Sequence, residues 1–367
     1  MIQAQRLKSL LQSLINIYSP SGKETDILHF LRDYLMRQGV ANIVEQAVDD
    51  TRFNLLVLPP GKEIVLALVG HVDTVPAYDL EEFEYQADGD RIYGLGAADM
   101  KAGCAAMIEA YLGLQEASPG APIGMCLVVG EEETGDGAEQ LVKEFQFPWV
   151  IVGEPTDLVP CLGCYSYMEI RLAATGKRVH ASMVQNNETA IESLLFLMLR
   201  ATNFLSTHYP EINYNFRDLY STPSGFAAPA SCEAWLDLHC PPEAMIDEML
   251  EKIGALTARK NNGGGIEIQN RLDVETIDPG FRLEPSGRVV SALQSVYAQL
   301  NLNWQPDDFK SHSDANQLKA AGINPIILGP GELIHAHAHD ESVSFNQVCR
   351  AAEIYFRVMN ELVQTTA

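Results

Sequence analysis

The chain has 367 residues, more than one hydrophobic core usually serves, so two domains are expected. Hydrophobic residues make up 47% and charged residues 20%, an ordinary globular composition that argues against long disordered segments. Asp and Glu outnumber Lys and Arg by 49 to 25, which gives a formal net charge of −24. So acidic a chain repels phosphate backbones, and this argues against nucleic acid as a partner.

The same composition argues against a membrane protein. No apolar run approaches the roughly 20 residues that a membrane helix needs, and the first 19 residues lack the pattern of a signal peptide. The seven cysteines are odd in number and have no framework spacing, so we expect reduced thiols in a cytoplasmic protein. The lone pair Cys161 and Cys164 is interpreted as two ordinary buried residues.

The two ends of the chain alternate helical and strand patterns. This alternation predicts an α/β layer with a mostly parallel sheet. The predicted helices cover residues 3–17, 24–38, 102–115, 286–300 and 345–363, and the predicted strands cover 53–58, 63–69, 124–129, 149–152 and 324–328.

The middle of the chain has a different pattern. Strands are predicted at 167–173, 230–238 and 266–272, and they alternate with helices at 188–206 and 243–258. This order predicts a small α+β domain inserted into the larger one. The predicted domains are therefore 1–166 with 279–367, and the insert 167–278.

Acidic residues and histidines follow five of the strand-like runs. Each has a simpler explanation when it stands alone: Asp73 or Asp99 as a helix cap, the Glu131–Glu133 run as a solvated loop, and the glycines as turn residues. Their shared place at strand ends favours a common site, because ligands of α/β sheets bind at the carboxyl ends of strands. The candidate segments are GHVDT at 70–74, GLGAADMK at 94–101, GEEETG at 130–135, GEPT at 153–156 and HAHAHDE at 335–341.

Such a donor set indicates a metal site. Imidazoles together with carboxylates suit zinc, with cobalt or manganese as alternatives, and no thiolate takes part. Burying three carboxylates without a cation would be prohibitively costly, so the metal interpretation is favoured over a chance cluster.

These motifs resemble the M20 family of metallopeptidases over essentially the whole chain. The resemblance implies a zinc-dependent exopeptidase-like catalytic domain with an inserted α+β dimerisation, or lid, domain, and a homodimer. It implies two Zn²⁺ per subunit, one held by His71 and Glu154, the other by Glu133 and His337, with Asp99 between them. It also implies a cis peptide at Asp99–Met100.

The resemblance assigns further roles. Asp73 is expected to orient His71, and Glu132 to act as the general base on a metal-activated water. His180 matches a histidine that the family supplies from the partner subunit to the oxyanion. His337 is chosen over its two neighbouring histidines because the family spacing is H-x-x-[DN]-E.

The substrate side departs from the family pattern. His239 stands where an arginine is expected, and imidazole cannot form the bidentate carboxylate clamp that arginine makes. The loop that contains Ser313, Asp314 and Asn316 resembles the substrate-side loop of the family, so substrate contacts are expected from these residues and from His239.

The predicted function is hydrolysis of an N-acyl amino acid or a small peptide through a di-zinc-activated water. An acetylornithine deacetylase or succinyl-diaminopimelate desuccinylase is the alternative among enzymes. A catalytically silent metal-binding homologue is the alternative outside them.

Overall fold

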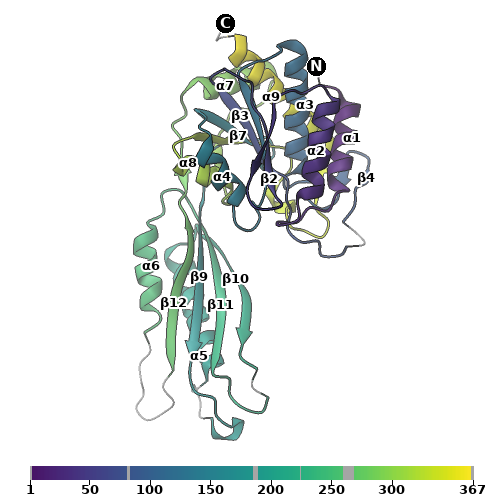
Figure 1. The fold of residues 1–367 in the computed structure, drawn as a ribbon. Coiled ribbons are helices and arrows are strands. Elements are labelled where there is room, and N and C mark those ends of the chain that lie inside the picture. The colour runs from purple at the N-terminus through teal and green to yellow at the C-terminus, as the bar shows by residue number, and fades with distance from the viewer. Residues whose placement is uncertain (1, 81–82, 185–188, 224, 259–267, 365–367) are drawn as a thin grey trace. The chain divides into compact units, whose positions relative to one another are not determined.

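The computed structural model describes residues 2–80, 83–184, 189–223, 225–258 and 268–364 (Figure 1). The chain divides into two compact units. The first contains Met1–Gly163, Arg282–Phe309 and Ser313–Ala367, and the second contains Cys164–Phe281 with Lys310–His312. The return of three residues, 310–312, to the second unit was not anticipated from the sequence.

A nine-stranded mixed sheet forms the centre of the first unit. Its middle strands, β6, β3, β7 and β15, are parallel, while β1, β2 and β8 run antiparallel to their neighbours. The order is β1 (Ile43–Ala47), β2 (Phe53–Val57), β6 (Ile123–Val128), β3 (Leu66–His71), β7 (Trp149–Val152), β15 (Asn324–Ile327), β8 (Cys161–Cys164) and β13 (Phe281–Arg282), and β14 (Asp307–Phe309) pairs with β8.

The predicted mostly parallel sheet is therefore correct for the four middle strands and wrong toward both edges, where β1 and β2 on one side and β8 on the other are antiparallel. Strands β1 and β2 are joined by a short turn at residues 48–52, and a connection this short allows only antiparallel pairing. The parallel strands need long crossovers, and helices supply them.

Helices cover the sheet of the first unit. All residues of β2, β3 and β6 are buried, as expected for strands covered on both faces. Helix α3 packs against α1 and α9, and α7 packs against α9. The helices are α1 (Ala4–Ile15), α2 (Thr25–Arg37), α3 (Lys101–Ala117), α4 (Asp136–Glu144), α7 (Arg288–Gln299), α8 (Asp314–Ala320) and α9 (Phe345–Gln364).

A small three-stranded sheet adjoins the site described below. Its central strand β5 (Arg91–Tyr93) pairs with β4 (Gln86–Asp88) and with β16 (Ser342–Ser344). It thereby joins a segment near residue 90 to one near residue 340. A short 3-10 turn, η2 (Leu333–His335), precedes β16.

The second unit is an antiparallel sheet with helices on one face. The strand order is β10 (Asn213–Ser221), β11 (Ser231–Cys240), β9 (Ser166–Thr175) and β12 (Gln269–Asp278). Burial alternates strictly along the first nine residues of β9, because one face packs against the helices and the other carries charged side chains. Apolar residues of α5 (Ala190–His208) and α6 (Ile246–Ala255) complete this core, and a 3-10 turn η1 (Ala181–Met183) follows β9.

Two parts of the insert differ from the prediction. Strand β10 was missed because its sequence, NYNFRDLYS, is largely polar and its residues are exposed or half-buried. The strand predicted at 266–272 begins among residues 259–267, which lie outside the described residues. No helix of the described segments is both long enough and apolar enough to cross a bilayer.

Two helical glycines allow a matched test of the packing. A Cβ on Gly103 of α3 would lie 2.2 Å from the Gly153 carbonyl oxygen, whereas a Cβ on Gly254 of α6 would meet nothing within 4 Å. We expect Gly103→Ala to destabilise the fold by about 1–3 kcal/mol through overpacking, and Gly254→Ala to stabilise it by up to about 1 kcal/mol. Urea unfolding followed by circular dichroism measures both, and equal effects would contradict the close packing of α3.

Candidate metal centre

The candidate site lies where the parallel strands of the first unit end. His71 is the last residue of β3, the run Glu131–Glu133 follows β6, and Glu154 follows β7. Asp99 precedes helix α3, whose N-cap is Met100, so the alternative interpretation of Asp99 as a cap does not hold. This is the edge of an α/β sheet where ligands bind.

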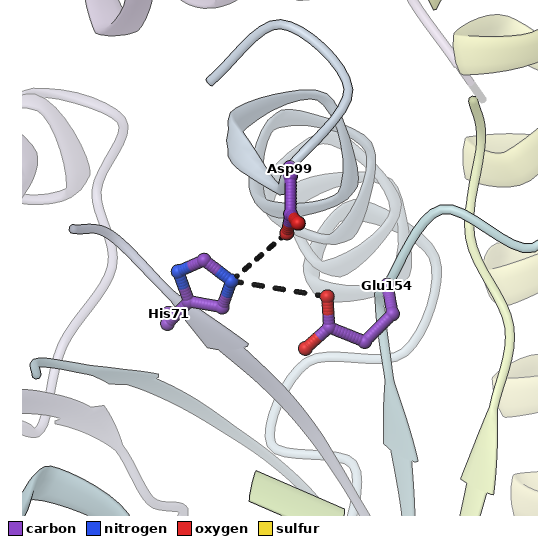
Figure 2. Close-up of side chains that lie close together, drawn as sticks. All are labelled: His71, Asp99 and Glu154. Atoms are coloured by element: carbon purple, nitrogen blue, oxygen red, sulfur yellow. Dashed lines mark hydrogen bonds and ion pairs between the residues drawn. The ribbon is translucent and has the colours of Figure 1, made fainter. Parts of the chain in front are cut away.

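The first donor group consists of His71, Asp99 and Glu154 (Figure 2). His71 Nε2 lies 3.2 Å from Asp99 Oδ1 and 3.8 Å from Glu154 Oε2. Figure 2 shows the two carboxylates converging on the same ring nitrogen. His71 is 1% exposed and Glu154 3% exposed, so these donors are almost completely removed from water.

The second donor group consists of Asp99, Glu132 and His337. His337 Nε2 lies 2.9 Å from Glu132 Oε2 and 3.6 Å from Asp99 Oδ2. Asp99 therefore belongs to both groups, and a different one of its oxygens faces each. His337 adopts a left-handed backbone conformation with φ of 57°, an arrangement that costs energy for a residue with a Cβ and is frequent at functional sites.

The acidic run is shifted by one residue from the prediction. Glu132, expected as the general base, occupies the position beside His337 and Asp99 that was assigned to Glu133. Glu133 is exposed, and it is Glu131 whose carboxylate approaches the first group, with Oε2 at 3.9 Å from His71 Nε2. Glu133, predicted as a ligand, therefore lies outside both donor groups, and Glu132, predicted as the base, belongs to the second.

Hydrogen bonds to Asp73 explain which of the three glutamates point toward the site. Its carboxylate accepts hydrogen bonds from the backbone N–H of Glu131 at 3.2 Å and of Glu132 at 3.1 Å, and from the Ser21 hydroxyl at 2.7 Å. These bonds hold the start of the acidic loop, so that the first two glutamates turn toward the site. His71 Nδ1 lies 3.1 Å from the carbonyl oxygen of Asp73 and 3.6 Å from its carboxylate. The orienting contact to His71 is therefore mainly through the backbone.

Burial dominates the electrostatics of the site. It raises the pKa of Glu154 to about 7 and raises the pKa of Glu131 and Glu132. Burial alone would lower the pKa of His71, but hydrogen bonds to Asp99 and Glu154 raise it well above its ordinary value. A hydrogen bond to Glu132 raises the pKa of His337 to about 9. Both rings thus lie in a strongly negative environment.

The donor set fits a pair of divalent cations. Among the described residues, Glu132 Oε1 and Glu154 Oε1 are buried without a hydrogen-bond partner. Unpartnered buried carboxylate oxygens are costly unless a cation or a proton compensates them. The nitrogen and oxygen donors of the two groups are those that zinc, cobalt and manganese accept.

The remaining predicted residues have different surroundings. Ser313 and Asn316 form a capping box at the start of α8, which is a structural role and gives no support to substrate contacts. Asp314 is 2% exposed, and burial raises its pKa well above the ordinary value. His180 is exposed in the second unit, where its Nδ1 lies 2.8 Å from the Ser182 hydroxyl.

His239 belongs to an aromatic cluster within the second unit. Its ring centroid lies 5.3 Å from that of Tyr167, and the Tyr167 ring stacks on His312 at 4.2 Å. Burial lowers the pKa of His239, so the ring is neutral at neutral pH. The carboxylate of Asp237, two residues earlier, accepts hydrogen bonds from Arg217 and Tyr167.

Glu341 supports the site, but no role was predicted for it from the sequence. Glu341 is 3% exposed and accepts hydrogen bonds from the loop that carries Asp99. The signal was present in the H-x-x-[DN]-E spacing, which was used only to choose His337. The predicted cis peptide at Asp99–Met100 is confirmed.

The corrected register leads to a test with adjacent residues. We expect Glu132→Gln to lower the zinc content of the purified protein, because a neutral amide replaces a buried carboxylate of the second group. The matched control Glu133→Gln changes an exposed side chain and is expected to leave the zinc content unchanged. Zinc per chain is measured by atomic emission after dialysis. A loss of zinc in Glu133→Gln but not in Glu132→Gln would instead support Glu133 as the ligand.

Comparison with known proteins agrees with this geometry. The model of peptidase family M20/M25/M40 matches residues 67–361. A probable carboxypeptidase from Aspergillus clavatus is 32% identical over 395 residues, covering 100% of this chain and 84% of the relative. An acetylornithine deacetylase from Aliivibrio salmonicida is 25% identical over 378 residues, covering 96% of this chain and 97% of the relative.

A solved structure shows the same fold. A tripeptidase from Staphylococcus aureus subsp. aureus Mu50 matches with a TM-score of 0.81 at 21% identity, covering 99% of this chain and 100% of that one. Because the family model spans most of the chain and includes every residue of both donor groups, the chain belongs to peptidase family M20/M25/M40 and is a metal-dependent hydrolase of peptide or related amide bonds.

Proposed function

We propose that this protein is a two-metal amidohydrolase that cleaves an N-acyl amino acid or a small peptide. The observation that supports two metals rather than one is the position of Asp99. Its Oδ1 faces the group with His71 and Glu154, and its Oδ2 faces the group with Glu132 and His337. A carboxylate shared in this way would suit a pair of cations, one held by each donor group.

The proposal assigns the metal ligands on this basis. His71 and Glu154 would hold one cation, Glu132 and His337 the other, and Asp99 both. Zinc is the proposed metal, with cobalt or manganese as alternatives, because all three accept imidazole and carboxylate donors. When bound, such cations polarise the amide carbonyl and lower the pKa of an attacking water toward neutrality.

Glu131 takes the role of general base in place of Glu132. Its side chain is 12% exposed and its Oε2 lies 3.9 Å from His71 Nε2, next to the first donor group. Burial raises its pKa, which suits a group that must accept a proton from water and then deliver it to the leaving nitrogen. Asp73 supports this role because it holds the Glu131 backbone.

The relatives support both enzymatic alternatives, and His239 bears on the choice of substrate. A deacetylase is supported by the relative from Aliivibrio salmonicida, and a peptidase by the relative from Aspergillus clavatus. The neutral His239 in place of the expected arginine favours substrates that do not depend on a bidentate carboxylate clamp. The oxyanion role of His180 stays a prediction, and so do substrate contacts by His239 and Asp314.

A glutamine at position 131 tests the base. We expect Glu131→Gln to keep the zinc content of the wild type and to lower kcat by about 10²- to 10⁴-fold, because it removes proton transfer but no ligand. Turnover is measured on acetylornithine, succinyl-diaminopimelate and a panel of dipeptides, with Glu133→Gln as the control.

Each result has a separate meaning. Unchanged kcat in Glu131→Gln would remove this residue from the chemistry. A wild-type protein that binds metal but turns over none of the substrates would favour the silent homologue.

We further propose a homodimer that forms through the second unit. Helix α5 presents an apolar stripe away from its core, with exposed fractions of 37% to 64%. Residues three or four apart on a helix share a face, so these side chains form one continuous patch. The stripe consists of Ile191, Leu195, Phe196 and Leu199.

A charge placed in this stripe tests the dimer. We expect the wild type to show about twice the chain mass of 40.4 kDa by light scattering, and Leu199→Glu to show the monomer mass. Met36→Glu is the control, because Met36 is 62% exposed on α2 of the first unit. A wild type at 40.4 kDa would contradict the proposal.

The cytoplasm remains the proposed location. It is supported by the seven cysteines, all of them in the described ranges, which form no disulfide.

A further inference from the structure

Glu341 is a buried carboxylate that belongs to neither donor group. Its Oε1 accepts the backbone N–H of Ala98 at 2.8 Å and of Asp99 at 3.0 Å, and its Oε2 accepts the backbone N–H of Gly96 at 2.8 Å. One side chain thus satisfies three donors of a single loop.

The loop held in this way is the one that carries Asp99. Its position decides where the shared carboxylate lies, because the Asp99 N–H is itself one of the three donors. Asp99 is the single residue common to both donor groups. A shift of this loop would therefore change the geometry of both groups together.

The backbone of Glu341 also contacts the segment that carries His337, a residue of the second donor group. Its N–H donates to the carbonyl of Ala338 at 3.1 Å, which closes a turn directly after His337. Its carbonyl accepts the N–H of Gly94 at 3.2 Å, and the pairing of β16 with β5 continues from there. Glu341 consequently joins the segment of Asp99 to the segment of His337, although 242 residues separate Asp99 from Glu341.

We propose that Glu341 is a positioning residue for the metal pair: it fixes the Asp99 loop against the His337 segment and so sets the spacing of the two donor groups. This inference rests on the proposed two-metal function. Glu341 touches neither metal nor substrate in this role. It acts through Asp99 and His337.

Replacing Glu341 by glutamine gives the most specific test. It keeps the size of the side chain but offers one oxygen, so its NH₂ group must face at least one of the three N–H donors. A buried N–H without an acceptor is expensive, and the loop is expected to move to avoid it. Replacing a group that orients metal ligands typically weakens metal binding by about 10- to 100-fold.

The experiment titrates Zn²⁺ into metal-free protein by calorimetry and measures kcat and KM on the best substrate of the panel. We expect Glu341→Gln to raise the zinc Kd about 10- to 100-fold and to lower kcat with KM little changed. Glu109→Gln is the matched control, since Glu109 is also fully buried and accepts a backbone N–H, from Gln3, away from the site. It is expected to affect the melting temperature only.

The outcomes separate this inference from the function on which it rests. If the wild type binds no zinc, the two-metal function fails. If the wild type binds two zinc ions and Glu341→Gln binds them with the same Kd and kcat, the positioning role is overturned. Should Glu341→Gln not fold, Glu341→Asp replaces it. This variant keeps the charge but shortens the reach, and unchanged zinc affinity would likewise overturn the proposal.

Discussion

The main constraint on this structure is that several carboxylates lie close together at one buried edge of the central sheet. Asp99, Glu131, Glu132 and Glu154 converge there, and only two imidazoles among the described residues oppose them within the donor groups. At a site so far removed from water, the repulsion between the carboxylates and the loss of their hydration cost much free energy. The high pKa of the glutamates expresses this cost, and divalent cations are what would relieve it.

Carboxylates also serve as the supports of the site. Asp73 holds the loop of Glu131 and Glu132 by their backbone N–H groups, and Glu341 holds the loop of Asp99 in the same manner. The site therefore uses acidic side chains for two purposes. Some point into it as candidate metal ligands, while others lie behind it and accept backbone hydrogen bonds that fix where the first set points.

The sequence was sufficient for the parts of the site that depend on strand ends. His71, Asp99 and Glu154 each follow or adjoin a segment with a clear pattern, and the structure brings them together. His337 lies against Asp99 as the family spacing implied. The antiparallel strands toward both edges of the main sheet were not predicted, because strand direction depends on which strands become neighbours.

The acidic run shows why other details could not be predicted. Which of three adjacent glutamates points inward depends on the path of the loop, and that path depends on hydrogen bonds to Asp73, 58 residues away from Glu131. Likewise, the segment of Ser313 and Asn316 resembles a substrate loop in sequence but forms a helix cap in space. Near His239, the carboxylate of Asp237 accepts a hydrogen bond from Arg217 on the neighbouring strand, a contact between strands that the local sequence does not reveal.

The division of the first unit has a consequence for biosynthesis. Its sheet is built from both ends of the chain, since β7 near residue 150 pairs with β15 near residue 325, whereas the second unit is continuous except for Lys310–His312. During translation the insert is therefore nearly complete while the main sheet still lacks its last strands. His337 and Glu341 emerge later still. The candidate metal centre is then among the last features to assemble, and a ribosome-bound chain that ends before them carries the acidic residues of the donor groups without their final histidine.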